Sequence, residues 1–185
     1  MPVGYPSNVL VVSDYENDRF EEQIRLRVDF TLSLGDNPVS ALKDIYERYR
    51  KPIFAIRGER DGKTPFPKGV INVHLQVEEY RNWTIGGFGG TLWHKDRGPN
   101  TWSDAEAEDM LAAMPCCDIF ICHSPIAKLT DKPGHEVYQG SEAIRRYIDD
   151  KQPRIVYHGH VRENWAERLG ETAIISVHGY KVVHL

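Results

Sequence analysis

Residues 154–160, RIVYHGH, combine a short apolar run with a polar end. Ile155, Val156 and Tyr157 are β-branched or aromatic residues, which favour strands, and a Gly-His pair follows the run almost at once. The segment is therefore expected to be a strand that delivers His160 into a polar site. Arg162 stands two residues further on, so a permanent cation is expected close to the same site.

The same plan occurs at four other places in the chain. Each run rises through apolar residues and ends in a carboxylate or an imidazole: NVLVVSD (8–14), DFTLSLGD (29–36), PIFAIRGERD (52–61) and CDIFICHSP (117–125). Further strands are expected at 84–88, 172–177 and 181–183. The glycines of GGFGG (86–90) predict a tight bend or a close approach of backbones, because no Lys-Ser/Thr pair follows as in a phosphate-binding P-loop.

Amphipathic segments lie between these runs. Apolar residues recur at helical spacing over 42–49, 107–114 and 143–148, which predicts three helices that each bury one face. Asn37 and Pro38 suit the start of the first helix, and Ser103 with Glu106 forms a capping box for the second. A weaker pattern predicts a helix over 16–27. Strands that alternate with helices favour an α/β fold, here as one domain over residues 1–185.

Composition excludes several classes of function. The 185 residues carry a net charge of −4, with 41% hydrophobic and 27% charged residues, as is ordinary for a soluble globular protein. This charge argues against stable nucleic-acid binding, which depends on dense lysine and arginine. No apolar run approaches the ~20 residues of a membrane span, and the first residues do not resemble a signal peptide.

The three cysteines, Cys116, Cys117 and Cys122, are too few and too closely spaced for a disulfide framework or a zinc-thiolate site. We expect them to be reduced residues of the core. Together with the absence of a targeting segment, they predict a cytoplasmic protein.

The polar ends of the five runs are expected to meet. Asp14, Asp36, Glu59, His123 and His160 each follow a predicted strand, and ligands of open α/β sheets bind beyond the carboxyl ends of the strands. Carboxylates and imidazoles are ligands for divalent cations. Two such ions held about 4 Å apart can clamp the attacking and leaving oxygens of a phosphoryl transfer. The pattern thus predicts a metal centre suited to phosphoester chemistry.

These residues also resemble the motifs of the calcineurin-like metallophosphoesterases, and of their small bacterial and archaeal branch in particular. The likeness runs from Asp14 in VVSDYE through Gly35-Asp36 in SLGDNP and Gly58-Glu59-Arg60-Asp61 in IRGERD to His123 in ICHSP and Gly159-His160 in HGHVRE. It covers almost the whole chain. The resemblance implies two packed, mixed β-sheets flanked by helices, in a four-layer α/β/β/α sandwich.

Four motif residues differ from the family pattern. Glu16 replaces the His of D-x-H, Glu59 replaces the Asn of GNH, Arg60 replaces the general-acid His, and Arg162 replaces the last His of GHxH. Arginine has no lone pair to offer a metal. By this resemblance one ion would be held by Asp36, Glu59, His123 and His160, and the second by Asp14, Glu16 and the bridging Asp36. Either this second ion is held by carboxylates and water alone, or the guanidinium of Arg162 takes its place. Arg162 pairing with Glu163 or Glu167, and Arg60 pairing with Asp61, are the competing surface interpretations.

The resemblance implies a role for each candidate residue. The metal ligands would be Asp14, Glu16, Asp36, Glu59, His123 and His160, and the catalytic residues Arg60, Asp61 and Arg162. For substrate binding we expect the loop WHKDRG (93–98), as a phosphate clamp or a stacking surface, and the end of the strand at 172–177. The residues concerned are His94, Lys95, Arg97 and His178. His158, on the opposite face of its strand from His160, is expected to be packed in the core.

The implied function is hydrolysis of phosphomonoesters or phosphodiesters by a metal-activated hydroxide. One or two divalent ions are expected, with Mn²⁺ as the first choice and Mg²⁺, Fe, Zn²⁺ or Ni²⁺ as alternatives. The partner would be a small phosphorylated substrate such as a nucleotide, with no membrane involved. The alternative function is a non-catalytic scaffold of the same fold, in which Arg162 replaces a metal ion.

Overall fold

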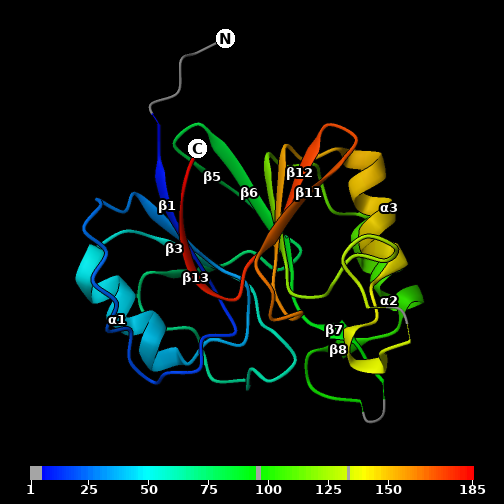
Figure 1. Ribbon diagram of the computed structural model, residues 1–185, viewed down its shortest axis with the longest axis horizontal. Helices are drawn as coiled ribbons and strands as arrows, with labels where there is room; N and C mark the ends of the chain where they lie inside the picture. The colour runs from blue at the N-terminus through cyan, green and yellow to red at the C-terminus, as the bar shows by residue number, and fades with distance from the viewer. Residues whose placement is uncertain (1–5, 95–96, 133) are drawn as a thin grey trace.

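The computed structural model describes residues 6–94, 97–132 and 134–185 and contains two large sheets packed face to face (Figure 1). In the described residues, one sheet has the strand order β13-β1-β2-β3-β4 and the other β11-β12-β10-β9-β6-β5. The first comprises β1 (Asn8–Ser13), β2 (Phe30–Ser33), β3 (Ile53–Ala55), β4 (Val70–Asn72) and β13 (Gly179–His184). The second comprises β5 (Val77–Tyr80), β6 (Trp83–Phe88), β9 (Ile119–Cys122), β10 (Ile155–His158), β11 (Trp165–Leu169) and β12 (Thr172–Ser176).

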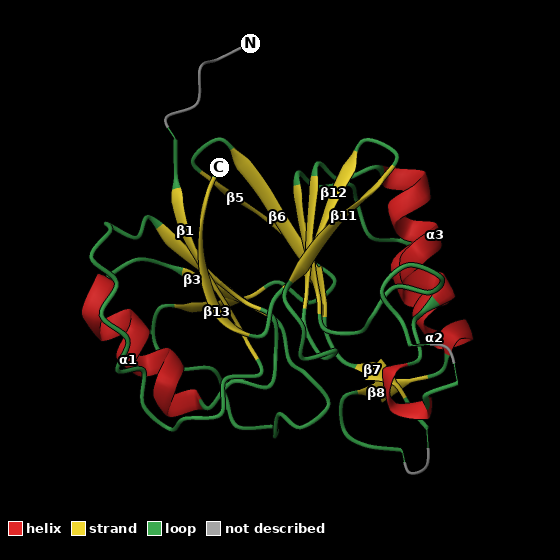
Figure 2. Ribbon diagram, viewed as in Figure 1, coloured by secondary structure: helices red, strands yellow, loops and turns green. Residues whose placement is uncertain are grey.

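Helices cover the outer faces of both sheets, as Figure 2 shows. Helix α1 (Val39–Tyr49) packs on the first sheet, whereas α2 (Asp104–Ala112) and α3 (Glu142–Lys151) pack on the second. A short 3-10 helix, η1 (Glu136–Tyr138), and a two-stranded pair of β7 (Thr91–Leu92) and β8 (Thr101–Trp102) complete the described elements. The four-layer α/β/β/α arrangement predicted from the sequence is confirmed.

Alternation along the buried strands explains the layers. In β1, Val9 and Val11 face the apolar layer between the sheets, while Leu10 and Val12 face α1, because successive strand residues point to opposite faces. Gly86 and Gly87 lie within β6, where a Cβ would come within 2.8 Å of Met114 and 2.7 Å of Ile121. The glycines at 86 and 87 therefore permit close packing, as expected, but inside a strand rather than in a bend.

Two local predictions are wrong. Residues 16–27 form no helix; the segment instead runs irregularly across α1, with the guanidinium of Arg48 bound to the carbonyl of Phe20. Only Phe20 and Ile24 of this segment share one helical face, which is too little apolar surface to hold a helix in place. Pro38, not Asn37, is the N-cap of α1. The amide of Asn37 instead accepts the N–H of Tyr15 and donates to the carbonyl of Val12.

The cysteine prediction holds for two of the three thiols. Cys117 and Cys122 are buried, and burial raises the pKa of Cys117 to about 11. Cys116 is exposed and lies in the irregular segment between α2 and β9. Among the described helices, none is long and apolar enough to span a bilayer.

Candidate metal centre

Five polar residues meet at one edge of the two sheets. Strands β1, β2 and β3 are mutually parallel, as are β6, β9 and β10, so the carboxyl ends within each set point the same way. The residues that follow these ends are Asp14, Asp36, Glu59, His123 and His160. The convergence predicted from the sequence is thus present in the structure.

The backbone at this edge is constrained. Asp14, Asp36 and His160 have φ angles of 49°, 53° and 67°. These lie in the left-handed region, which residues other than glycine rarely adopt. Such strain persists only where surrounding contacts fix it, and it concentrates at functional sites.

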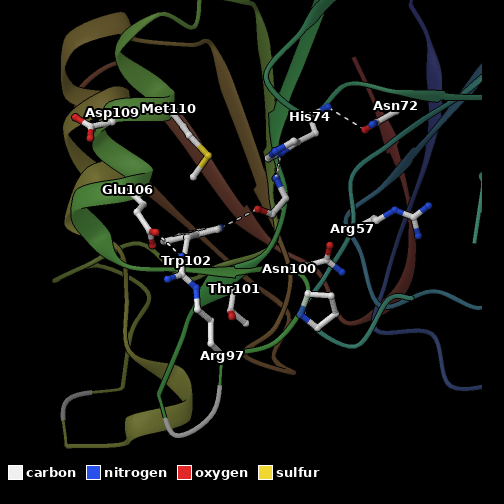
Figure 3. Close-up of a pocket in the computed structure, with 12 residues that line it drawn as sticks. Arg57, Asn72, His74, Arg97, Asn100, Thr101, Trp102, Glu106, Asp109 and Met110 are labelled. Atoms are coloured by element: carbon white, nitrogen blue, oxygen red, sulfur yellow. Dashed lines mark hydrogen bonds and ion pairs between the residues drawn. The ribbon is translucent and has the colours of Figure 1, made fainter. Parts of the chain in front are cut away.

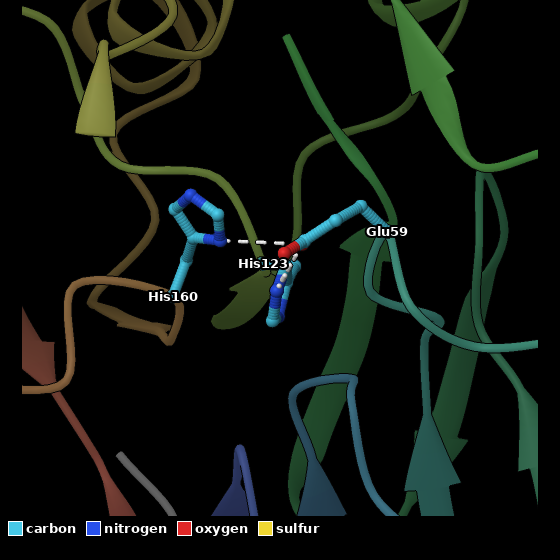
Figure 4. Close-up of side chains that lie close together, drawn as sticks. All are labelled: Glu59, His123 and His160. Atoms are coloured by element: carbon cyan, nitrogen blue, oxygen red, sulfur yellow. Dashed lines mark ion pairs between the residues drawn. The ribbon is translucent and has the colours of Figure 1, made fainter. Parts of the chain in front are cut away.

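Three ligand-type atoms face one another at the centre of the cluster (Figure 4). The Oε2 atom of Glu59 lies 2.8 Å from Nε2 of His123 and 3.2 Å from Nδ1 of His160. A second group of three, Asp14, Asp36 and His123, shares the same imidazole. Oδ2 of Asp36 lies 3.5 Å from Nε2 of His123. Three carboxylates and two imidazoles thus belong to the two groups that share His123.

Backbone carbonyls orient both imidazoles. Nδ1 of His123 donates to the carbonyl of Leu34 at 2.7 Å, and Nε2 of His160 donates to the carbonyl of Val137 at 2.7 Å. A carbonyl can only accept, so each ring carries a proton on that outer nitrogen, and its other nitrogen faces Glu59. Metal-bound histidines are usually held by a partner of this kind.

Burial at the centre leaves polar atoms unsatisfied. Oε2 of Glu59 and Nε2 of His123 are buried and face each other at 2.8 Å, and neither is hydrogen-bonded to any other group among the described residues, although buried polar atoms are costly to leave unpaired. Burial lowers the pKa of His123, but the carboxylates of Asp36 and Glu59 outweigh it and raise that pKa well above its ordinary value. Burial raises the pKa of Glu59, but the two imidazoles lower it further than burial raises it. A divalent cation would satisfy these same atoms, so the donor set fits a metal.

Arg60 occupies the other half of the cluster. Its Nε donates to Oδ2 of Asp36 at 2.7 Å, and its Nη2 donates to Oδ1 of Asp14 at 3.3 Å. The second oxygen of Asp14 accepts the hydroxyl of Ser13 and the N–H of His160. Both oxygens of Asp14 are therefore bound by protein donors. The guanidinium pairs with Asp14 and Asp36, the carboxylates assigned to a second ion.

Arg162 and Glu16 lie outside this cluster. Nη1 of Arg162 is 3.3 Å from Oε1 of Glu16, and the two side chains are 45% and 64% exposed. Arg162 was expected to take the place of a metal ion beside Asp14, Glu16 and Asp36; it pairs with Glu16 alone of these three, whereas Arg60 contacts Asp14 and Asp36. Arg162 also pairs with Glu16 rather than with Glu163 or Glu167. Glu16 belongs to neither group of metal-ligand atoms found among the described residues.

Asp61 holds the loop that carries Glu59 and Arg60. Its Oδ2 accepts the N–H groups of Asp36 and Gly58, both at 2.9 Å, and burial raises its pKa. These contacts favour a positioning role rather than direct chemistry. Arg60 pairs with Asp14 and Asp36 rather than with Asp61.

The residues expected to bind substrate do not gather at the centre. Arg97 pairs with Glu106 and lines a neighbouring cavity, and His94 is exposed. His178 exchanges hydrogen bonds with Asn164 through its backbone. Lys95 lies outside the described residues. A cleft of about 440 Å³ beside the centre is lined instead by residues from the loops after β1, β2 and β3, among them Tyr15, Glu16, Asp36, Arg57, Arg60 and Asp61.

His158 is packed in the core, as expected. Its side chain is fully buried, its ring lies 5.9 Å from that of Trp165, and burial lowers its pKa to about 4.

The carbonyls of Leu34 and Val137 that orient His123 and His160 were not predicted, because backbone groups carry no signal in the sequence.

Gly159 packs closely against Ser13 and Asp14, and its replacement tests that packing. A Cβ at this position would lie 2.0 Å from Oγ of Ser13 and 2.9 Å from Oδ2 of Asp14. We expect Gly159→Ala to lower the free energy of unfolding by about 1–3 kcal/mol, as other overpacking substitutions do. Urea denaturation measures the change. Gly62→Ala is the control, because nothing lies within 4 Å of a Cβ there. Equal stability of the two variants would contradict the packing described.

Comparison with known proteins places this geometry among related folds. The family model described as calcineurin-like phosphoesterase matches residues 9–163. A search of curated protein sequences finds no match.

Several solved structures share the fold. TT1561 of Thermus thermophilus is 17% identical with a TM-score of 0.62, over 95% of this chain and 90% of that one. The phosphopantetheinyl hydrolase of Mycobacterium tuberculosis is 12% identical with a TM-score of 0.62, over 96% and 91%. GAP50, the anchor in the inner membrane complex of Plasmodium, is 15% identical with a TM-score of 0.52, over 92% and 71%. At these identities the likeness concerns the fold alone.

Proposed function

Because this chain belongs to the calcineurin-like phosphoesterase family, we propose that it is a phosphoesterase with one metal ion, in which Arg60 supplies the second positive charge. The convergence of Glu59, His123 and His160 on one point carries this proposal. With Asp36 they offer two carboxylate and two imidazole ligands. Such a set suits Mn²⁺ first and also admits Mg²⁺, Fe, Zn²⁺ or Ni²⁺.

The position of Arg60 argues for one ion rather than two. A guanidinium has only N–H hydrogen-bond donors and no lone pair, so it cannot coordinate a metal. It does neutralise carboxylates through paired hydrogen bonds. With Arg60 on Asp14 and Asp36, the carboxylates of the second site already have their counter-charge.

Arg60 has N–H groups that its ion pairs with Asp14 and Asp36 do not use, and these could bind phosphate. Its side chain is 49% exposed and lines the cleft of about 440 Å³, so the N–H groups not bound to Asp14 and Asp36 are available to phosphoryl oxygens. Donors fixed in advance by two buried carboxylates stabilise charge that develops on those oxygens. A divalent ion, when bound, polarises a phosphoryl oxygen and activates water for attack on phosphorus.

The substrate is expected to have a good leaving group. In the resembling family the residue at position 60 is a general-acid histidine, and arginine does not release a proton in the accessible pH range. We therefore propose that small phosphorylated esters with activated leaving groups are hydrolysed fastest.

One observation favours a second candidate function. The same ion pairs of Arg60 with Asp14 and Asp36 would hold the site together without any metal, as in a scaffold that has lost catalysis. The fold does not decide between them, because a hydrolase and an anchor protein both share it.

Metal content and turnover distinguish the two candidates. The protein, loaded with Mn²⁺ and desalted, should retain about one ion per chain by elemental analysis and hydrolyse bis(p-nitrophenyl) phosphate or p-nitrophenyl phosphate. Chelation should remove the activity and added Mn²⁺ should restore it, because Arg60 alone provides no activated water. A chain that retains no metal and hydrolyses neither ester with any of the five candidate ions would support the scaffold.

A further inference from the structure

A cavity of about 500 Å³ is bordered by α2, β8 and the ends of β4 and β6 (Figure 3), and it shares Arg57 with the cleft beside the metal centre. Cavities of this size suit small organic ligands. Its wall includes His74 and Trp102, with Met110 of α2 opposite in the view of Figure 3. The metal centre uses none of these three residues.

One wall is a fixed set of rings. His74 stacks on Phe88 with ring centroids 5.4 Å apart and an interplanar angle of 23°, and Phe88 contacts Trp102 at 4.9 Å. Nε1 of Trp102 donates to the carbonyl of Gly89 at 3.0 Å, so the indole is also held by a hydrogen bond. Phe88 and Trp102 are buried, so the partly exposed imidazole of His74 is the ring of this set on which another ring can stack.

The polar atoms of this wall have defined roles. Nδ1 of His74 accepts the N–H of Gly89 at 2.9 Å, so the proton of the neutral ring is on Nε2. Burial lowers the pKa of His74, which favours this neutral form. The imidazole can therefore donate one hydrogen bond to an acceptor on a ligand.

The fixed charges of the cavity cancel. Arg97 pairs with Glu106, and the guanidinium of Arg57 is bound to the carbonyls of Gly62 and Thr64 and lies over the ring of Phe66. Asp109 adds one negative charge to the lining, as Arg57 adds one positive charge. A ligand group without net charge fits this balance better than a second phosphate.

The cavity adjoins the site proposed to bind phosphate. Arg57 lines both this cavity and the cleft that contains Arg60. Asn100, also in the cavity wall, donates through Nδ2 to the carbonyls of Gly58 at 2.9 Å and Asp61 at 2.6 Å. The wall is thus bonded to both ends of the segment that carries Glu59 and Arg60.

We propose that this cavity binds an uncharged planar ring, bearing a hydrogen-bond acceptor or an aromatic face, in the organic part of the phosphoester substrate. The inference rests on the proposed function, because the phosphoryl group of that substrate would lie at Arg60 and the metal. It defines the substrates as aryl or heteroaryl phosphoesters rather than simple alkyl phosphates.

Two phosphonates that cannot be hydrolysed test the inference. Calorimetry on the Mn²⁺-loaded protein compares 2-naphthylmethylphosphonate with ethylphosphonate, which share the anionic group and differ in the ring. We expect the naphthyl compound to bind about tenfold or more tightly, since stacking on aromatic side chains contributes at this level. Equal affinities, or no binding of the naphthyl compound, would overturn the proposal.

Two substitutions locate the ring. Met110→Trp fills the cavity and His74→Ala removes the stacking wall, so each should reduce the affinity ratio toward one while ethylphosphonate binding stays unchanged. Glu108→Trp is the matched control. Glu108 is exposed on the same helix as Met110, but it pairs with Arg146 and does not line the cavity. A ratio that neither cavity variant changes would place the ring elsewhere. Because phosphonates are not turned over, absence of hydrolysis would refute the proposed function without affecting this result.

Discussion

Replacing His123 with alanine is expected to abolish metal binding and, with it, hydrolysis. His123 is fully buried and belongs to both groups of metal-ligand atoms. Its replacement removes the one imidazole that both groups of ligand atoms share. Loss of a group that only orients a metal ligand lowers metal affinity about 10–100-fold. Loss of the ligand His123 itself should therefore lower the affinity at least about 100-fold. Titration of the metal-free protein with Mn²⁺, followed by an assay with an aryl phosphate, measures both effects.

His158→Ala is the matched control for this variant. His158 is equally buried and ends the adjacent strand, paired with Cys122 directly before His123, but its side chain faces the core. Both variants should lose stability through the cavity that they leave, yet only His123→Ala should lose the metal. If both variants retained one ion per chain, His123 would not be a ligand.

Replacing Arg60 with alanine should raise the metal content from about one ion per chain to about two. The substitution releases Asp36 and Asp14 from the guanidinium, and two close carboxylates without a counter-charge attract a cation. Carboxylates and water suffice for Mn²⁺ or Mg²⁺. Phosphate affinity should fall in the same variant, because the exposed N–H groups of Arg60 are lost. Elemental analysis after desalting gives the ion count.

Arg162→His separates the two arginines. Arg162 contacts Glu16 outside the cluster, so its replacement alone should leave one ion per chain, although it restores the residue type expected at that position. The double variant of Arg60→Ala with Arg162→His should hold the second ion no more tightly than Arg60→Ala alone, because position 162 lies outside the cluster. Two ions in the Arg162→His variant, with Arg60 unchanged, would show that Arg60 does not block the second site.

The residues at strand ends were predictable, for a geometric reason. Parallel strands deliver their following residues to one edge, so Asp36, His123 and His160 could be brought together from the sequence before any coordinates. These features depend on backbone geometry that short apolar runs specify strongly.

The roles of the two arginines were not predictable in the same way. Arg60 and Arg162 both follow strand ends, and both side chains are long enough to reach several carboxylates. Which one reaches Asp14 depends on the loop after β3, whose path is set by the hydrogen bonds of Asp61 and Asn100. The second cavity was equally hidden, because His74 and Trp102 come from segments without a recognisable motif.

The position of the metal ion tests the central claim most directly. A crystal of the protein soaked with Mn²⁺ can be measured at a wavelength where manganese scatters anomalously. We predict one anomalous peak per chain, within coordination distance of Oε2 of Glu59, Nε2 of His123 and Nδ1 of His160, with Arg60 still bound to Asp14. Two peaks bridged by Asp36 with Arg60 displaced, or no peak among these atoms, would contradict a one-metal centre completed by an arginine.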